Sequence, residues 1–522
     1  MRIRITLTGG RPGGSDMAAA AEHRRKTLLP FCITLLSAAW LQVVTSPGAM
    51  GLEPRAPGAK MSLGQMRAMP QSGNVVVKFR EGSGIRLRGG RLIGLRGADA
   101  ARFVNILSET RVATNAIERL HTRPEGELNS EREAAQRESG RELADLNLYY
   151  VIRMPAGASA AELAARLNGL RSVEFAEPGP RPAPLPIDIP PVSPKLTAYQ
   201  GYKKAPPQGI GALNPNKVPG GDGKGVPFVD IEYSWQLNHE DLELPASANI
   251  DTGATLSDPF SDTNHGTAVL GEVVGKKNAY GVTGIAPRSK AYVAPANTTQ
   301  FGYNPARAIG IATAKLRRGQ VMIIEQQYWA CGGNQFGPLE VLQSVFDAIA
   351  IATAKGIVVV AAAGNGGINL DSQACGGLFD RTVRDSWAII VGAGSSTDHS
   401  RLNFSSYGSR VDVQGWGQAV ATTGYGDAFN PGDIRQRYTN TFSGTSSATP
   451  IVAGTILAIQ GALKAAGIPL AKPKAMRKTL VKTGTPQSNP GTGHIGPLPR
   501  TKAALNKLDG AGMSAQDTVA MR

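Results

Sequence analysis

Hydrophobic and polar positions divide the chain into two segments with different patterns. In the first, the stretches 74–80, 146–155 and 172–178 have the apolar, β-branched composition of strands, and 159–170 repeats apolar residues with the period of a helix. A charged stretch with a helical pattern separates the first two strands. This order of elements predicts a small α+β domain over residues 70–180.

The second segment alternates strands with helices. Its strand patterns are apolar throughout, which is typical of parallel strands covered on both faces. In such folds function is expected at the carboxyl ends of the strands. The pattern predicts an α/β domain with a doubly wound, mostly parallel sheet over residues 196–510. Predicted strands cover 225–231, 289–295, 321–328, 357–365 and 386–394, and predicted helices cover 265–275, 304–319 and 339–356.

A further apolar helix pattern lies in "TFSGTSSATPIVAGTILAIQGALKAAG" (441–467), where hydroxyl side chains and a proline precede the apolar run. Ser and Thr are ordinary helix N-caps. A helix N-terminus also stabilises negative charge through its free N–H groups and its dipole. The pattern alone leaves open whether these hydroxyls only cap the helix or include a reactive serine.

Two segments outside the folded domains are recognisable by composition. The proline-rich stretch "PGPRPAPLPIDIPPVSP" predicts an extended linker over 181–195. Residues 23–44 join a basic run to an apolar run, which is typical of a secretory signal. Pro30 and Gln42 interrupt the apolar run and argue against a stable membrane anchor, with an uncleaved span as the alternative. We therefore expect a signal peptide region within residues 1–50 and a secreted protein.

Composition and charge narrow the class of protein. A chain of 522 residues with 41% hydrophobic residues, 63 Gly and 35 Pro is typical of a globular protein with many turns and two or three folded units. The net charge of +16 would suit an anionic partner. Arginine is densest before residue 180, however, and no aromatic-rich basic motif accompanies it. We expect no nucleic-acid partner.

Cysteine usage agrees with export. Cys32 lies in the predicted signal region, so its removal leaves Cys331 and Cys375. An even number of cysteines in an exported protein predicts one disulfide, worth roughly 3–4 kcal/mol for a loop of that size. The alternative is a pair of buried free thiols.

Three residue types needed for acyl transfer occur where such a fold exposes its side chains. Asp230 closes a predicted strand, His265 opens a predicted helix, and Ser446 opens the long apolar helix. An acid, an imidazole and a hydroxyl supply an orienting carboxylate, a general base and a nucleophile. Asn365 follows a buried strand, where its side-chain amide can donate to a developing oxyanion.

These motifs together resemble the subtilisin-like serine protease family. The chain order Asp…His…Ser, with "HGT", "AAAGN" and "GTSSATP", is specific in combination. The resemblance covers roughly residues 195–508 and implies Ser446 as nucleophile, His265 as general base and Asp230 as its orienting acid. It also implies Asn365 as oxyanion donor, and an N-terminal α+β domain that acts as a propeptide.

Some assignments have alternatives. Asp251 in "NIDTGAT" has the Asp-Thr-Gly context that the family usually shows, but Asp230 ends a strand and is followed by the family-like "HEDL". Asn365 before two glycines would suit an ordinary turn. Asp241 matches a position that ligates calcium in some relatives, although a surface aspartate near a helix is the simpler interpretation. No other cofactor is expected.

The clearest departure from the family pattern is "IIEQQYWACGG". Relatives have an Asn-Met-Ser-Leu-Gly-Gly stretch here, which lines the substrate groove and binds the peptide as an added strand. Tyr328 and Trp329 occupy positions where glycines are expected, so side-chain preference is not assigned.

The sequence predicts a secreted, monomeric serine endopeptidase that acts on protein or peptide substrates and is inhibited by its own propeptide. A catalytically silent, peptide-binding protein of the same fold is the alternative, because the groove segment is altered.

Overall fold

The computed structural model describes residues 52–182, 196–333 and 335–520. The predicted signal region (1–50) and nearly all of the predicted linker (181–195) lie outside the described residues. We call residues 52–182 the N-terminal region and residues 196–520 the C-terminal region. All of the described residues belong to one compact unit.

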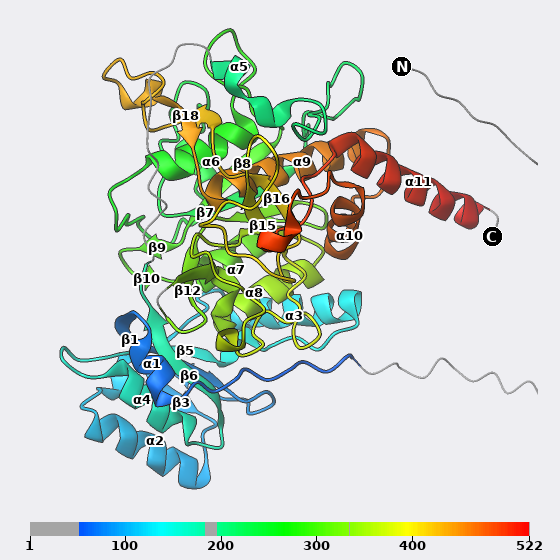
Figure 1. The fold of residues 1–522 in the computed structure, drawn as a ribbon. Coiled ribbons are helices and arrows are strands. Elements are labelled where there is room, and N and C mark those ends of the chain that lie inside the picture. Colours follow the sequence, from blue (N-terminus) through cyan, green and yellow to red (C-terminus); the bar gives the residue numbers. More distant parts are fainter. Residues whose placement is uncertain (1–51, 183–195, 334, 521–522) are drawn as a thin grey trace, which may run out of the picture. The chain divides into compact units, whose positions relative to one another are not determined.

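A parallel sheet forms the centre of the C-terminal region (Figure 1). Its order is β16-β15-β14-β11-β7-β8, so the chain adds β8 on one side of β7 and all later strands on the other. This reversal makes the sheet doubly wound, as predicted, with a switch point between the carboxyl ends of β7 and β11. The strands are β7 (Pro227–Glu232), β8 (Lys290–Pro295), β11 (Val321–Ile324), β14 (Val358–Ala362), β15 (Ile389–Gly394) and β16 (Val413–Trp416).

Helices cover both faces of this sheet, which explains why its strands are apolar throughout. Helices α6 (Asn264–Val274) and α9 (Thr445–Ala465) pack on the face that carries Phe228, Ile323 and Val360. Helices α7 (Pro305–Lys315) and α8 (Gln343–Ala354) pack on the opposite face. Within the described residues α9 is the one helix long and apolar enough to cross a membrane, and its apolar stretch of 18 residues is completely buried in the core of this domain.

The remaining elements of the C-terminal region surround this core. A two-stranded antiparallel hairpin, β12–β13, follows β11 directly. The elements are α5 (Leu196–Tyr199), β9 (Asn297–Thr298), β10 (Gly302–Tyr303), β12 (Gln327–Ala330), β13 (Gln335–Pro338), β17 (Val420–Thr423), β18 (Tyr438–Phe442), α10 (Pro473–Thr483) and α11 (Thr501–Ala520).

The N-terminal region contains an antiparallel sheet of order β4-β5-β1-β6. Alternate residues of its strands face opposite sides, so Val75 and Val77 pack under the helices of this region, whereas Val76 packs toward the C-terminal region. The elements are α1 (Leu63–Ala68), β1 (Gln71–Phe79), β2 (Arg86–Arg88), β3 (Arg91–Ile93), α2 (Gly97–Glu109), β4 (Ile117–Arg119), α3 (Glu125–Ser139), β5 (Tyr149–Arg153), α4 (Ala160–Asn168) and β6 (Val173–Pro180).

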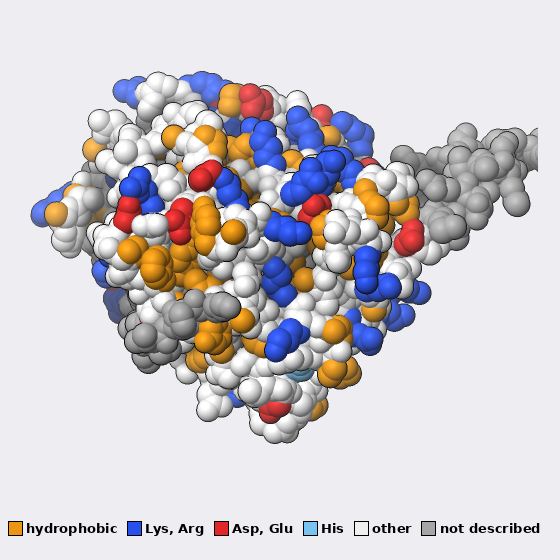
Figure 2. All heavy atoms as spheres, turned by 90° about the horizontal axis from the view of Figure 1, so that it is seen from above, with side chains coloured by type: hydrophobic (Ala, Val, Ile, Leu, Met, Phe, Trp, Pro, Cys, Tyr) orange, Lys and Arg blue, Asp and Glu red, His pale blue; other side chains and the backbone are white. Residues whose placement is uncertain are grey.

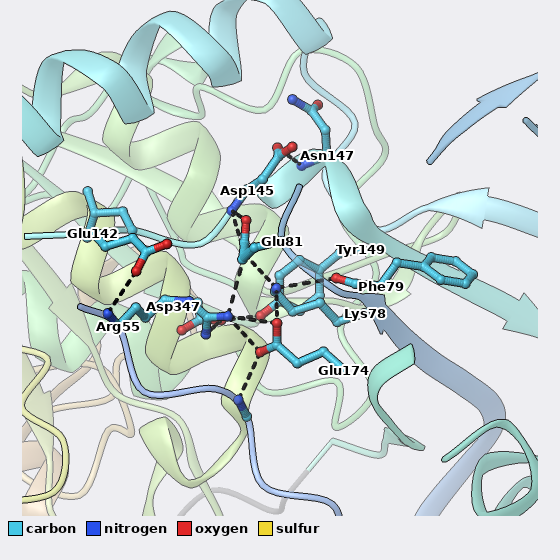
Figure 3. Close-up of polar contacts among 12 residues, drawn as sticks. Arg55, Lys78, Phe79, Glu81, Glu142, Asp145, Asn147, Tyr149, Glu174 and Asp347 are labelled. Atoms are coloured by element: carbon cyan, nitrogen blue, oxygen red, sulfur yellow. Dashed lines mark hydrogen bonds and ion pairs between the residues drawn. The ribbon is translucent and has the colours of Figure 1, made fainter. Parts of the chain in front are cut away.

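A buried polar network joins the two regions (Figure 3). Arg55 Nη2 lies 2.7 Å from Glu174 Oε2, and Lys78 Nζ lies 2.6 Å from the same oxygen. The Tyr149 hydroxyl donates to Asp347 of α8, and Arg55 lies 3.8 Å from that carboxylate. Because Lys78 and Tyr149 are fully buried, these contacts satisfy groups that would otherwise be costly to remove from water.

Charged, hydrophobic and neutral side chains are mixed on the surface of the C-terminal region. On the face shown in Figure 2, Lys and Arg side chains are interspersed with Asp, Glu, hydrophobic and neutral side chains. The positive charge is therefore spread over this face.

Most of the predicted elements are present, and the differences have local causes. The predicted strand 321–328 breaks after Ile324, and its second half turns away to form β12. β16 was not predicted, because polar and glycine residues interrupt its apolar pattern. The long helix starts at Thr445, six residues before the apolar run, with Pro450 inside it.

The prediction of a disulfide is confirmed, since Cys331 and Cys375 are bonded. Cys331 follows β12 directly, and Cys375 lies in the segment between β14 and β15. The alternative of two free thiols is wrong.

We expect the double substitution of Cys331 and Cys375 by Ser to lower the free energy of unfolding by about 3–4 kcal/mol, because the bond closes a loop of 44 residues in the unfolded chain. Urea unfolding would measure the loss. Wild-type protein unfolded with a reductant should match the double variant, and equal stability of oxidised and substituted chains would contradict the prediction.

Candidate active site

A buried histidine and a buried glutamate form the centre of the candidate site. His265 is the second residue of α6, and its Nδ1 is hydrogen-bonded to Glu232 Oε1 at the carboxyl end of β7. The other oxygen of Glu232 accepts hydrogen bonds from Tyr233 N and Gln326 Nε2, both at 3.2 Å. Three hydrogen bonds therefore fix the orientation of this carboxyl group.

The carboxylate that contacts His265 is Glu232 and not the predicted Asp230. Asp230 lies on the same face of β7 as Glu232, and its Oδ2 accepts a hydrogen bond of 2.7 Å from Trp235 Nε1. Burial and the charge of Glu232 raise the pKa of Asp230 well above its ordinary value. The predicted strand ended at residue 231, but β7 continues to Glu232, which places the later carboxylate at the end of the strand.

Short contacts between the loop after β7 and α6 hold this pair in place. Thr267 Oγ1 donates to Thr263 O at 2.7 Å and accepts from Gln236 N at 2.8 Å. A Cβ atom on Gly266 would lie 2.4 Å from Ser234 O, so only glycine allows the helix to approach the loop this closely. The "HGT" motif thus places His265 directly over the end of β7.

Ser446 is the second residue of α9 and is almost fully buried. The helix is preceded by Gly444, whose φ of 102° is a conformation that other residues rarely adopt. Ser447 Oγ donates to Trp416 O at 3.0 Å and anchors the first turn to β16. The first N–H groups of any helix lack intrahelical partners, so Ser446 stands where negative charge is stabilised.

Asn365 follows β14 and points its amide toward the same helix start. Its Oδ1 accepts hydrogen bonds from Thr445 N at 2.8 Å and from Thr445 Oγ1 at 3.0 Å. These donors fix the orientation of the amide. The Nδ2 atom is buried and has no hydrogen-bond partner among the described residues, which leaves a donor available beside Ser446. Asn365 is therefore more than a turn residue.

The alternative acid, Asp251, has a structural role. Both of its oxygens bind Arg307 of α7, with Oδ1 2.8 Å from Nη2, and both side chains are buried. Asp251 therefore pairs with Arg307, whereas the carboxylate that contacts His265 comes from β7, two positions after Asp230.

Asp241 is buried rather than on the surface. Its carboxylate binds Asn278 Nδ2 and Val282 N, the latter at 2.8 Å, and so holds the 278–282 loop. Burial raises the pKa of Asp241 to about 6. The described residues contain no cluster of three metal-ligating side chains, and calcium binding at Asp241 stays untested.

The altered groove segment contacts each part of the site. Glu325 follows β11 and interacts with the hydroxyl of Ser446, Gln326 binds Glu232, and Gln327 Oε1 accepts a 2.8 Å hydrogen bond from Asn365 N. Farther along, Tyr328 is fully buried, donating to Pro70 O at 3.0 Å and accepting from Arg181 N at 3.3 Å. The N-terminal region therefore covers the hairpin.

Comparison with known proteins agrees with this geometry. The model of the Subtilase family matches residues 229–512, which begin in β7 and include Glu232, His265, Asn365 and Ser446. The chain belongs to the subtilase family.

Individual members of the family are moderately similar to this chain. Subtilisin NAT of Bacillus subtilis subsp. natto is 29% identical over 268 residues, which are 48% of this chain and 60% of that protein. Subtilisin of Bacillus pumilus is 31% identical over 242 residues, 44% of this chain and 75% of that protein. The chain thus spans about 60% of the length of the first of these relatives.

A solved structure shows the same fold. Fervidolysin from Fervidobacterium pennivorans, a keratinolytic enzyme related to subtilisin, superposes with a TM-score of 0.50 at 17% identity. The match covers 88% of this chain and 63% of that structure.

Glu232 and the 325–327 segment are the site residues that the sequence analysis missed. The signal for Glu232 was present: Asp230 and Glu232 have the same parity on one strand, so both face one side, and the later one lies nearer to the strand end. For Glu325, Gln326 and Gln327 the signal was a run of polar residues directly after a buried strand, at a position where this fold places function.

Proposed function

We propose that the chain is a secreted serine endopeptidase that hydrolyses peptide bonds through an acyl-enzyme, with Glu232, His265 and Ser446 as its catalytic groups. The hydrogen bond between the buried Glu232 carboxylate and His265 Nδ1 carries the proposal. A carboxylate on Nδ1 selects the tautomer in which Nε2 carries no hydrogen and can accept a proton. The predicted signal region and the disulfide support secretion.

The proposed reaction has two halves. Ser446 Oγ attacks the carbonyl carbon of the substrate while His265 Nε2 takes the hydroxyl proton. The resulting oxyanion accepts hydrogen bonds from Asn365 Nδ2 and from the backbone N–H of Ser446. Collapse of this intermediate breaks the C–N bond, and the leaving amine takes the proton from His265. Water then attacks the acyl-enzyme by the same steps and releases the acid.

We also propose that the N-terminal region is an intramolecular inhibitor that is cut away in the predicted linker. Its sheet packs against α7 and α8, and Tyr328 in the groove hairpin hydrogen-bonds to Pro70 and Arg181. A substrate that adds a strand at β12 would compete with these contacts. Removal of the N-terminal region would therefore open the groove.

Two titratable groups at this interface give it a pH dependence. Glu177 of β6 faces Asp347 and Arg384, and burial raises its pKa from 4.5 to about 8. His121 packs against α7, and burial, together with Arg119 and Arg123, lowers its pKa from 6.5 to about 3. Both groups are thus neutral while the N-terminal region is docked.

The proposed chemistry is tested at Ser446. A fluorophosphonate should label Ser446 in the wild-type chain, and Ser446→Ala should abolish labelling and self-cleavage because no other group can form the acyl-enzyme. N-terminal sequencing of the secreted form and mass spectrometry of the label provide the readouts. A wild-type chain that is secreted intact and stays unlabelled would favour a silent, peptide-binding protein.

The orienting acid is tested by a matched pair. Glu232→Gln should lower kcat/KM for a denatured protein substrate by about 10³–10⁴-fold, because the amide no longer selects the catalytic tautomer of His265. Asp230→Asn should cost less than about tenfold, since the pKa of Asp230 is raised and its carboxyl binds Trp235 instead of His265. Equal losses of kcat/KM in the two variants would favour Asp230 as the orienting acid.

Docking of the N-terminal region should be strongest between about pH 4.5 and 6.5. Glu177 has a raised pKa, so its contribution is lost as pH rises from 4.5 toward 8, and that of His121 is lost as pH falls from 6.5 toward 3. Limited proteolysis of the N-terminal region in the Ser446→Ala chain would report undocking. Glu177→Gln should remove the alkaline loss and His121→Asn the acid loss; unchanged profiles would refute this.

A further inference from the structure

One buried carboxyl beside the site is not used by the proposed reaction. Glu325 follows β11 directly and is 2% exposed. The parallel register pairs Ile324 with Ile231, so Glu325 follows at the level of Glu232 on the neighbouring strand. Ile323 packs under α9, and side-chain alternation therefore directs Glu325 toward the same helix. The switch point of the sheet thus brings Glu325 to Ser446.

The groups that face Glu325 are almost all acidic. The hydroxyl of Ser446 interacts with its carboxyl, and Glu232, Asp230 and Glu272 act on it electrostatically. Neither oxygen makes a hydrogen bond by distance and angle among the described residues, and Ser446 is the uncharged side chain that acts on the carboxyl. The basic side chain among these groups is His265, and its Nδ1 is hydrogen-bonded to Glu232. No cation therefore faces Glu325 among these groups to stabilise its ionised form.

Burial, reinforced by the neighbouring acids, raises the pKa of Glu325 well above its ordinary value. A neutral carboxylic acid donates a hydrogen bond, whereas a carboxylate can only accept one. The two forms would therefore have opposite effects on a hydroxyl that has a single proton to donate.

We propose that Glu325 is a positioning residue for Ser446, which in its neutral form donates to Oγ and leaves the hydroxyl proton directed at His265. On ionisation the carboxylate accepts that proton's hydrogen bond instead, and its charge opposes the oxyanion that develops beside it. The inference rests on the proposed function and adds a second acid that must stay protonated for Ser446 to react.

The two following residues make the same segment a support for the whole site. Gln326 Nε2 lies 3.2 Å from Glu232 Oε2, and Gln327 Oε1 lies 2.8 Å from Asn365 N. Three consecutive side chains thus contact the nucleophile, the acid that orients the base, and the oxyanion donor. The residues that depart from the family pattern therefore make contacts of their own with the site.

The test is the rate of fluorophosphonate labelling of Ser446 in the full chain, measured from about pH 5 to pH 10. The wild-type rate should rise as His265 loses its proton and fall again as Glu325 ionises. Glu325→Gln cannot ionise, so its alkaline fall should be absent, whereas Glu325→Asp should retain one. Thermal unfolding of each variant checks the fold. An alkaline fall in Glu325→Gln equal to that of the wild type would overturn the inference.

Glu272→Gln is the matched control, because it removes an acid of the same cluster on α6. The Glu272 charge raises the pKa of Glu325, so its loss should move the alkaline fall to lower pH without removing it. If Glu325→Gln does not fold, the Glu272→Gln variant alone tests the inference. An alkaline fall in the labelling rate that stays at the wild-type pH would then contradict the role of Glu325. A wild-type chain that is never labelled would refute the proposed function itself, whereas labelling with unchanged profiles would refute only this inference.

Discussion

The burial of several acids on one face of one sheet is the constraint on which this site depends. Asp230, Glu232, Glu272 and Glu325 are all removed from water, and charged carboxylates cannot share so small a volume without partners. Glu232 has three hydrogen-bond donors, whereas Trp235 is the side-chain donor to Asp230 and Ser446 is the neighbour of Glu325. Glu232 is therefore the acid of this face with the most hydrogen-bond donors, whereas burial raises the pKa values of Asp230 and Glu325 well above their ordinary range.

The doubly wound sheet brings these groups together from distant parts of the chain. Loops leave the ends of β7 and β11 in opposite directions, and Glu232 and Glu325 lie at the opening between them. The helices that start over this opening, α6 and α9, add His265 and Ser446 near their N-termini. Glu232, His265 and Ser446 thus lie on a strand or a helix, and Glu325 directly follows a strand, which limits the reorganisation that a reaction would need.

The sequence was sufficient for the fold class and for placing His265 at the start of a helix, because long apolar runs and the "HGT" motif depend on local rules that the structure follows. It was insufficient for the carboxylate that contacts His265, since Asp230 and Glu232 differ only in how far a strand continues, and strand ends are set by neighbouring strands. The role of the 325–327 segment was also beyond local reasoning. Its contacts arise from the register of β11 with β7 and from the approach of α9, which are long-range features.

The disulfide encloses part of the site in a covalent ring. The chain from Cys331 to Cys375 includes β13, α8, β14 and Asn365, so the oxyanion donor lies inside the ring, while Glu232, His265 and Ser446 lie outside it. The two halves of the proposed catalytic machinery are thereby secured in different ways, one by a bond that needs an oxidising compartment and the other by noncovalent contacts. A chain retained among cytosolic reductants would keep the contacts around Glu232, His265 and Ser446 but hold Asn365 less firmly.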